Sequence, residues 1–200
     1  LLTRLLFVWF IKQKNLIPDE LFDVNELENN ILTELNPVKE DGLFAEMSKD
    51  SVYYKAILQN LFFASLNCPI KPQSGDEDKR ERGFRRNKNY GDDFGNDWLF
   101  RYEKYFKDPD AFVELINSKV PFLNGGLFEC LDDKANNIII DGFSDNLKKP
   151  DRLVVPDYLF FGKDENVDLS EDYGDNSLQY KQASVKGLIN ILKTYNFTVE

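Results

Sequence analysis

The stretch DSVYYKAILQNLFFASLN, residues 50–67, carries the clearest structural signal in this chain of 200 residues. Its large apolar side chains recur at three- and four-residue intervals, which is the spacing of one face of an α-helix. Asp50 or Ser51 can serve as the N-cap, because a short oxygen-bearing side chain accepts hydrogen bonds from the first N–H groups of a helix. Pro69 ends the pattern, since proline cannot continue the hydrogen-bond ladder. A helix is therefore predicted here, with the apolar positions Tyr53, Tyr54, Ile57, Leu58, Leu61, Phe62 and Leu66.

The residues before this helix are expected to be helical as well. Residues 1–13, LLTRLLFVWFIKQ, are apolar on almost every side of a helix, which is typical of a buried helix. Pro18 breaks this helix, and residues 23–35 predict a polar helix that stops before Pro37. The longest uninterrupted apolar run covers only residues 5–11, whereas a membrane span needs about 20 residues. We expect no contact with a membrane.

Residues 68–97, CPIKPQSGDEDKRERGFRRNKNYGDDFGND, interrupt the helical periodicity. Proline, glycine, serine and charged residues dominate this stretch, which is the composition of loops and of disordered segments. We predict a long basic and acidic loop that is disordered in part. Loops of this length inside a compact domain are usually functional or mobile.

Helical patterns return after the loop. WLFRYEKYF, residues 98–106, predicts one short helix. Asp108 and Pro109 predict the start of another, because aspartate is a good N-cap and proline suits the first helical position. A further helix is predicted within residues 184–197, and its apolar face consists of Val185, Leu188, Ile189, Leu192 and Tyr195.

Three short apolar runs lie between these helices: GGLFECL, NNIIID and RLVVPDYLFF. They are rich in β-branched and aromatic residues and are separated by turn-forming residues, so short strands or a hairpin are predicted around residues 127–161. The predicted fold class is mainly α with a small β component (α+β), in one compact domain. Its parts are a helical segment at 1–67, the loop at 68–97, and a helical segment with the small β region at 98–200.

The overall composition excludes several kinds of function. The net charge of −10 argues against a dedicated nucleic-acid binder, although an average over the chain can hide a local basic patch. The chain has no histidine, which excludes Ser-His-Asp and Cys-His catalysis and zinc sites ligated by histidine. Cys68 and Cys130 form no CxxC pair, and buried reduced thiols are favoured over a disulfide.

One local basic patch does occur within KRERGFRRNKNY, residues 79–90. Guanidinium groups match the geometry of phosphate, and Phe84 and Tyr90 are placed to stack on bases. The alternative is a solvated loop whose charge balances the acidic residues beside it. Both interpretations remain open, and the candidate DNA-binding residues are Lys79, Arg80, Arg82, Arg85, Arg86 and Lys88.

The glycine pair in LNGG, residues 123–126, matches neither common phosphate-binding template. A Walker loop needs four residues between its glycines and then Lys and Ser/Thr, and a dinucleotide fingerprint needs three spaced glycines. The favoured interpretation is a tight turn, with a positive φ at Asn124, Gly125 or Gly126, that leads into a strand. The side chains expected to pack inward around this turn are Phe122, Leu123, Leu127 and Phe128.

The residues of two catalytic cores are missing or misplaced. A metal nuclease of the PD-(D/E)xK kind needs an acid and a lysine two residues apart on a strand, but residues 77–79 and 132–134 have this spacing in turn-like stretches. An adenine methyltransferase needs an Asn/Asp-Pro-Pro-Tyr/Phe loop, and Asn36-Pro37-Val38 lacks its second proline and its aromatic residue. We therefore expect no catalytic, cofactor-binding or metal-ligating residue in this chain.

Six blocks of the sequence nevertheless resemble, in their order and spacing, one region of a known family. The region lies just before the methyltransferase core of type IIG restriction–modification enzymes and of related adenine-specific DNA methyltransferases. The resemblance covers nearly all of the chain. The blocks are LLTRLLFVWFIKQKNLI, YYKAILQNLFFASLN, VPFLNGGLFECLD, IIIDGFSDN, VPDYLFF and GLINILKTYNFTVE.

This resemblance implies a mostly helical, non-catalytic connector, cut from a longer cytoplasmic protein of a bacterium or archaeon. A nuclease would precede it, and an N6-adenine methyltransferase and a target-recognition domain would follow. The parent protein would use S-adenosylmethionine and Mg²⁺, while the connector holds neither and contacts DNA and the flanking domains. One alternative is a protein-interaction scaffold without a nucleic-acid role, whose acidic surface at residues 164–175 engages a basic partner. A self-standing enzyme has the least support.

Overall fold

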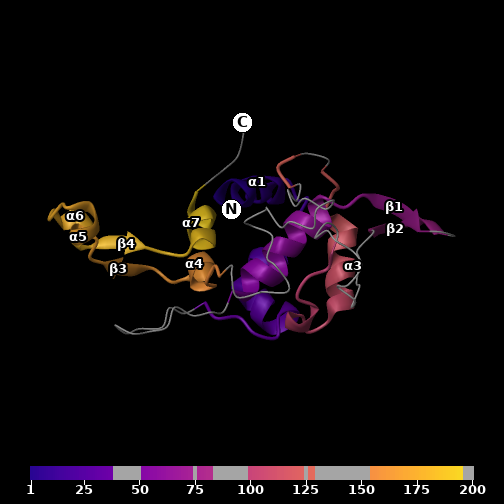
Figure 1. The fold of residues 1–200 in the computed structure, drawn as a ribbon, viewed down its shortest axis with the longest axis horizontal. Helices are drawn as coiled ribbons and strands as arrows, with labels where there is room; N and C mark the ends of the chain where they lie inside the picture. Colours follow the sequence, from indigo (N-terminus) through magenta and orange to yellow (C-terminus); the bar gives the residue numbers. More distant parts are fainter. Residues whose placement is uncertain (38–50, 74–75, 83–98, 124–125, 129–153, 196–200) are drawn as a thin grey trace, which may run out of the picture.

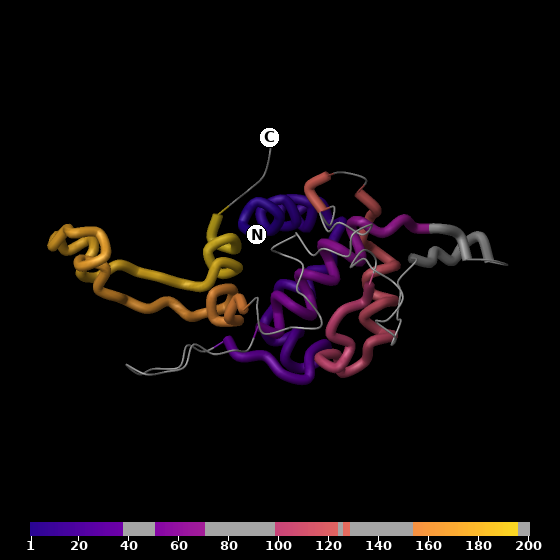
Figure 2. Tube along the Cα trace, viewed as in Figure 1, coloured from indigo at the N-terminus to yellow at the C-terminus, as the bar shows by residue number. Residues whose placement is uncertain are grey.

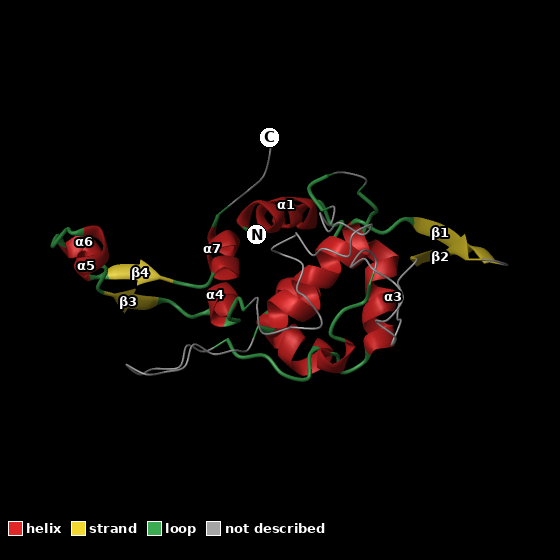
Figure 3. Cartoon of the chain, in the orientation of Figure 1, coloured by secondary structure: helices red, strands yellow, loops and turns green. Residues whose placement is uncertain are grey.

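A computed structural model describes residues 1–37, 51–73, 76–82, 99–123, 126–128 and 154–195. The described chain is mainly helical with a small β component, as the sequence predicts. Two antiparallel hairpins project from opposite ends of a helical body (Figure 1). Figure 2 traces one of them, the segment at residues 163–186 that we call the arm, out of the body and back. Figure 3 shows the large helices gathered in the body and the strands confined to the two projections.

The described helices belong either to the body or to the arm. Those of the body are α1 (Leu2–Gln13), η1 (Asp19–Phe22), α2 (Val24–Glu26), η2 (Leu27–Ile31), η3 (Tyr53–Leu58), η4 (Asn60–Leu66), η5 (Glu103–Tyr105), α3 (Pro109–Lys119), α4 (Tyr158–Phe161) and α7 (Leu188–Thr194). The arm consists of β3 (Glu165–Val167), α5 (Ser170–Tyr173), α6 (Leu178–Lys181) and β4 (Ala183–Val185). The other projection, which we call the ribbon, consists of β1 (Ile70–Gln73) and β2 (Asp76–Arg82).

Helix α1 confirms the helix predicted at the start of the chain. Leu5 and Val8 are fully buried in the core. Leu2 and Leu6, however, are exposed. The expectation that this helix is buried all round is therefore wrong, because one of its apolar sides faces solvent.

The helix predicted over residues 23–35 is shorter than expected. The Asp23 carboxylate caps α2 by accepting hydrogen bonds from two first-turn N–H groups, at 2.9 and 3.2 Å. The helix runs on through η2 and ends at Ile31. Leu32 then forms an antiparallel β-bridge with Phe106, so the chain leaves the helical path to pair with a distant segment.

The helix predicted over residues 50–67 is confirmed and lies at the centre of the body. η3 and η4 join through Gln59 into one helix, in which hydrogen bonds of the π type run from an N–H to the carbonyl five residues earlier. Every residue from 51 to 66 is buried, so this central helix is enclosed on all sides. Its buried polar side chains include Lys55, Gln59, Asn60 and Ser65.

Asn60 ties the central helix to the segment before η5. Its Nδ2 donates hydrogen bonds to the carbonyls of Arg101, at 2.8 Å, and Ala56, at 2.7 Å. Its Oδ1 accepts the backbone N–H of Arg101 at 2.7 Å. The side-chain amide of Asn60 thereby provides hydrogen bonds to both the backbone N–H and the backbone carbonyl of Arg101.

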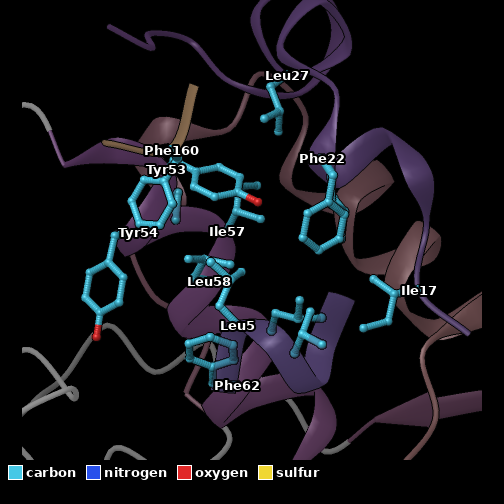
Figure 4. Packing of buried hydrophobic residues seen from close by; sticks show 14 of the residues in the cluster. Leu5, Ile17, Phe22, Leu27, Tyr53, Tyr54, Ile57, Leu58, Phe62 and Phe160 are labelled. Carbon is cyan, nitrogen blue, oxygen red and sulfur yellow. The ribbon is translucent and has the colours of Figure 1, made fainter. Parts of the chain in front are cut away.

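One apolar core joins the N-terminal helices, the central helix, α3, α4 and α7. Figure 4 shows Leu5 of α1, Phe22 of η1 and Phe62 of the central helix as members of this one cluster of buried side chains. Aromatic rings contribute much of the packing. Pairs with ring centroids 4.3 to 5.9 Å apart include Phe106 and Phe112, Trp9 and Phe22, and Phe100 and Phe112.

The ribbon corrects the prediction that residues 68–97 form a loop. β1 and β2 pair antiparallel, with Ile70 opposite Arg82 and Lys71 opposite Glu81. Opposite charges at cross-strand positions favour such pairing, and Ser74-Gly75 between the strands is a turn-forming sequence. Charged strands lack the apolar alternation on which a strand prediction depends, and this explains the error. The rest of the predicted loop lies outside the described residues.

The predicted β region around residues 127–161 is also corrected. Leu127 and Phe128 lie in a turn, and residues 158–161 form helix α4 rather than a strand. In α4 the N–H groups of Phe160 and Phe161 donate to the Asp157 carbonyl at 3.0 and 3.1 Å. Residues 129–153, which include NNIIID, lie outside the described part of the chain.

Helix α7 confirms the predicted C-terminal helix over part of its length. Ile189 and Leu192 are buried in the core. Val185 and Tyr195 are exposed. Neither belongs to α7: Val185 is the last residue of strand β4, and Tyr195 follows the last turn of the helix. None of the described helices has the length and apolar character needed to cross a bilayer.

Candidate nucleic-acid interface and ligand pocket

The structure places half of the predicted DNA-binding residues on one strand. Lys79, Arg80 and Arg82 belong to β2 of the ribbon. Along the ribbon, position 80 pairs with Pro72 and position 82 with Ile70. Arg85, Arg86 and Lys88 lie outside the described residues.

The ribbon has a shape that suits nucleic acid. It extends away from the helical body (Figure 1). A two-stranded β-ribbon fits the major groove of DNA, and lysine and arginine at its edge can reach phosphate oxygens. The acidic residues at positions 76–78, at the start of β2, oppose this role and leave the basic end of the strand as the candidate contact.

The LNGG loop is held against the body as a structural element. The Nε of Arg4 donates a hydrogen bond to the Leu127 carbonyl at 2.7 Å. Phe128 is buried, with its ring centroid 5.7 Å from that of Phe7 and 5.8 Å from that of Phe62. The loop therefore joins α1 to the central helix.

The inward packing predicted around this loop holds for part of it. Phe128 is buried and Leu123 packs against the core, as predicted. Phe122 and Leu127 are each 36% exposed, so for these two the prediction is wrong. Gly126 has no positive φ, and residues 124–125 lie outside the described part.

Two arginines that the sequence did not single out are buried against Phe63 of the central helix. The guanidinium carbons of Arg4 and Arg101 lie 5.0 and 4.9 Å from the centroid of the Phe63 ring. A cation over an aromatic face is stabilised by the negative face of the ring. We interpret both arginines as elements that fix α1 and the Arg101 segment to the central helix.

Asp157 is a buried acidic side chain at the centre of the fold. Its carboxylate accepts the backbone N–H of Tyr53 at 2.8 Å and that of Asn36 at 3.2 Å. Burial of the Tyr53 hydroxyl raises the pKa of this side chain well above its ordinary value, and the negative charge of Asp157 raises it further. Asp157 therefore organises the start of the central helix.

A pocket of about 620 Å³ lies at the base of the arm. One wall is the helix face formed by Val24, Asn25 and Glu28. The floor is the junction of α4 with the start of α7, and Pro37 lies at the side. The opposite wall is one face of the arm, formed by Lys163, Glu165, Val167 and Val185.

The pairing of the arm explains which of its residues face the pocket. Glu165 pairs with Val185, so both lie on the same face, and positions 163 and 167 share that face by alternation. Pockets of about 300 to 1,000 Å³ that are mostly apolar with a few polar groups are typical of small-molecule sites. Sequence reasoning missed this site, because its walls come from segments far apart in the chain.

At the end of the arm, Asp168 begins a short helical turn. Its carboxylate accepts hydrogen bonds from the hydroxyl and the backbone N–H of Ser170, and these bonds lower the pKa of Asp168. The rings of Tyr173 and Tyr180 stack with centroids 4.9 Å apart. The arm therefore has its own local order beyond the pocket.

Among the residues that the structure describes, no group of three or more His, Cys, Asp or Glu is arranged to hold a metal ion. Comparisons of the chain with known protein families, with curated proteins and with solved structures find no match.

Proposed function

We propose that this chain is a non-catalytic helical connector of a type IIG-like restriction–modification enzyme, and that its ribbon contacts the DNA backbone. The observation that carries the DNA contact is the position of Lys79, Arg80 and Arg82 on a strand that projects from the body. The connector role is supported by the six sequence blocks that resemble the region before the methyltransferase core. In this proposal the arginines and lysines position DNA without reading its sequence.

The parent enzyme would methylate adenine at N6 with S-adenosylmethionine and cleave DNA with Mg²⁺. Both groups belong to the flanking nuclease and methyltransferase domains in this proposal, and the connector sets the spacing between them. A single apolar core that joins α1 to α7 supports such a role, because it fixes the distance between the two ends of the described chain. The coding sequence on either side tests the parent class: an Asn-Pro-Pro-Tyr or Asp-Pro-Pro-Tyr tetrapeptide is expected downstream.

DNA binding is tested by fluorescence anisotropy with a labelled duplex over a series of salt concentrations. Each phosphate contact contributes about 0.9 to the slope of log affinity against log salt. The triple variant Lys79→Ala/Arg80→Ala/Arg82→Ala should bind more weakly and give a shallower slope. The matched control removes three exposed lysines elsewhere, Lys119→Ala/Lys181→Ala/Lys193→Ala, and should keep the slope of the unmodified chain.

A flat salt response, or equal slopes for the two triple variants, would contradict the DNA contact. The alternative is a protein-interaction scaffold, and one observation favours it: Tyr173 and Leu178 on the arm are 65% and 69% exposed. Carboxylates at positions 171, 172 and 175 lie close to them in the sequence, which suits a basic partner. Pull-downs that recover a protein through the arm, together with absent DNA binding, would support the scaffold.

A further inference from the structure

The pocket at the base of the arm combines an apolar lining with a local pair of cations. Val24, Leu159, Val167 and Val185 contribute apolar surface from both walls and from the floor. Leu159 and Val185 are large apolar side chains that remain partly exposed to solvent. A ligand with an apolar body would remove this surface from water, and each Å² of apolar surface removed contributes roughly 25 cal/mol.

The cations lie where the chain enters and leaves the arm. The Gly187 N–H donates to the Gly162 carbonyl at 2.8 Å, and we call this crossing the neck. Lys163 follows Gly162 and Lys186 precedes Gly187, so the two lysines flank the same hydrogen bond and both line the pocket. Within the described part of the chain, neither lysine forms an ion pair.

The carboxylates of the pocket are distributed differently from its lysines. Glu28 lies on the helix wall, whereas Glu165 lies on the arm wall, two positions from Lys163 on the same face. Both lysines adjoin the neck and Glu165 offsets only one of their charges, so this end of the pocket keeps a net positive charge, with Glu28 on the other wall. This arrangement complements a ligand whose single negative charge lies at one end of an apolar body.

We propose that this pocket binds a small organic anion with an aromatic or branched aliphatic body, whose carboxylate or sulfonate group is held by Lys163 and Lys186. The body lies between the helix wall and the arm wall. This site is separate from the ribbon, and the proposal does not depend on DNA binding.

The proposal is tested with 8-anilinonaphthalene-1-sulfonate, an aromatic anion that fluoresces when it leaves water. The unmodified chain should bind it saturably at one site, with weaker binding at higher salt. Lys163→Ala/Lys186→Ala should weaken binding about three- to tenfold, because two partly exposed charge contacts are lost. N-phenyl-1-naphthylamine has a similar ring system without the charge, and its binding should be insensitive to this double variant.

The position of the site is tested by a matched pair of substitutions. Val185→Glu places a carboxylate in the apolar wall and should weaken dye binding about tenfold or more. Leu178→Glu makes a similar apolar-to-acidic change at the end of the arm, outside the pocket lining, and should leave binding unchanged. Circular dichroism and the melting temperature establish that each variant is folded. Leu159→Glu, at another exposed position of the lining, replaces Val185→Glu if the latter unfolds.

Three results would overturn the proposal. Unchanged dye binding in a folded pocket variant would show that the dye binds elsewhere. Equal affinity of the double lysine variant and the unmodified chain would remove the role of the cations. Tighter binding of the neutral dye than of the sulfonate would show an apolar site without preference for an anion.

Discussion

The Asp157 carboxylate accepts the backbone N–H of Tyr53 at 2.8 Å, across 104 residues of sequence. N-caps usually come from the residue just before the helix. Here Ser51 stands near that position, but its hydroxyl exchanges hydrogen bonds with the backbone of Val155, at 3.0 and 2.9 Å. The segment before α4 thereby supplies the cap of the central helix, and folding of the two is coupled.

Removing this cap should destabilise the whole body. Asp157→Ala removes the acceptor of the buried Tyr53 N–H and of the part-buried Asn36 N–H, and should lower the free energy of unfolding by about 2–4 kcal/mol. Asp157→Asn keeps one acceptor oxygen and should lose less. Urea unfolding followed by circular dichroism measures both. A loss within 0.5 kcal/mol, about the size of an ordinary surface substitution, would contradict the role of Asp157.

Because of the Tyr53 hydroxyl, we expect the stability of the folded chain to fall at alkaline pH. This hydroxyl is buried and, among the described residues, has no hydrogen-bond partner. Its raised pKa means that the unfolded chain releases this proton near pH 10, whereas the folded chain retains it. Stability from this group is therefore complete below about pH 10 and is lost as the pH rises further.

Tyr53→Phe should remove this part of the pH dependence. At pH 8 the variant should be as stable as the unmodified chain or about 1 kcal/mol more stable, because an unsatisfied buried hydroxyl is lost. At pH 10.5 to 11 its advantage should grow. The measurement is urea unfolding at both pH values, with Tyr173→Phe on the exposed arm as the control. An advantage that shrinks at high pH would have the wrong sign.

Gln59 offers a stabilising substitution in the central helix. Its side chain is fully buried, and neither of its amide atoms has a hydrogen-bond partner among the described residues. Methionine has a similar length and no amide to desolvate, so Gln59→Met should raise the free energy of unfolding by about 1–2 kcal/mol. Gln182→Met, at an exposed position, serves as the control. Destabilisation by Gln59→Met would show that the amide has a bonding role after all.

The neck should tolerate no side chain at Gly187. A Cβ there would lie 2.5 Å from the Gly162 nitrogen and 2.5 Å from the Phe160 carbonyl oxygen. Gly187→Ala should therefore cost about 1–3 kcal/mol, since both neighbours are backbone atoms that cannot move aside alone. Gly126→Ala is the control, because a Cβ there meets nothing within 4 Å. Equal stability of the two variants would contradict the close approach.

The sequence predicted the elements whose signals are local. Asp108 caps α3, as expected, by accepting the N–H groups of Asp110 and Ala111 at 3.0 Å. The central helix followed from the spacing of its own apolar residues. Leu2 and Leu6 show the limit of that reasoning, because periodicity alone does not tell which apolar side of a helix has a partner.

Features that depend on a distant partner were missed. The run YLFF before the arm is apolar and aromatic enough for a strand, and a run of this length does not separate strand from helix. The capping of the central helix by the distant Asp157 and the hydrogen bonds between Asn60 and Arg101 produce no pattern in the local sequence. The candidate pocket is missed for the same reason, since its walls meet only after folding.

The neck also has a consequence for the architecture of the chain. Gly162 and Gly187 are joined by a backbone hydrogen bond, so the two ends of the arm already lie side by side where they leave the body. Residues 163–186 therefore behave as an insertion in the body, and a short turn between the two glycines should replace them without opening the core. The helical body and the arm can thus change independently in sequence, as a constant framework and an exchangeable module.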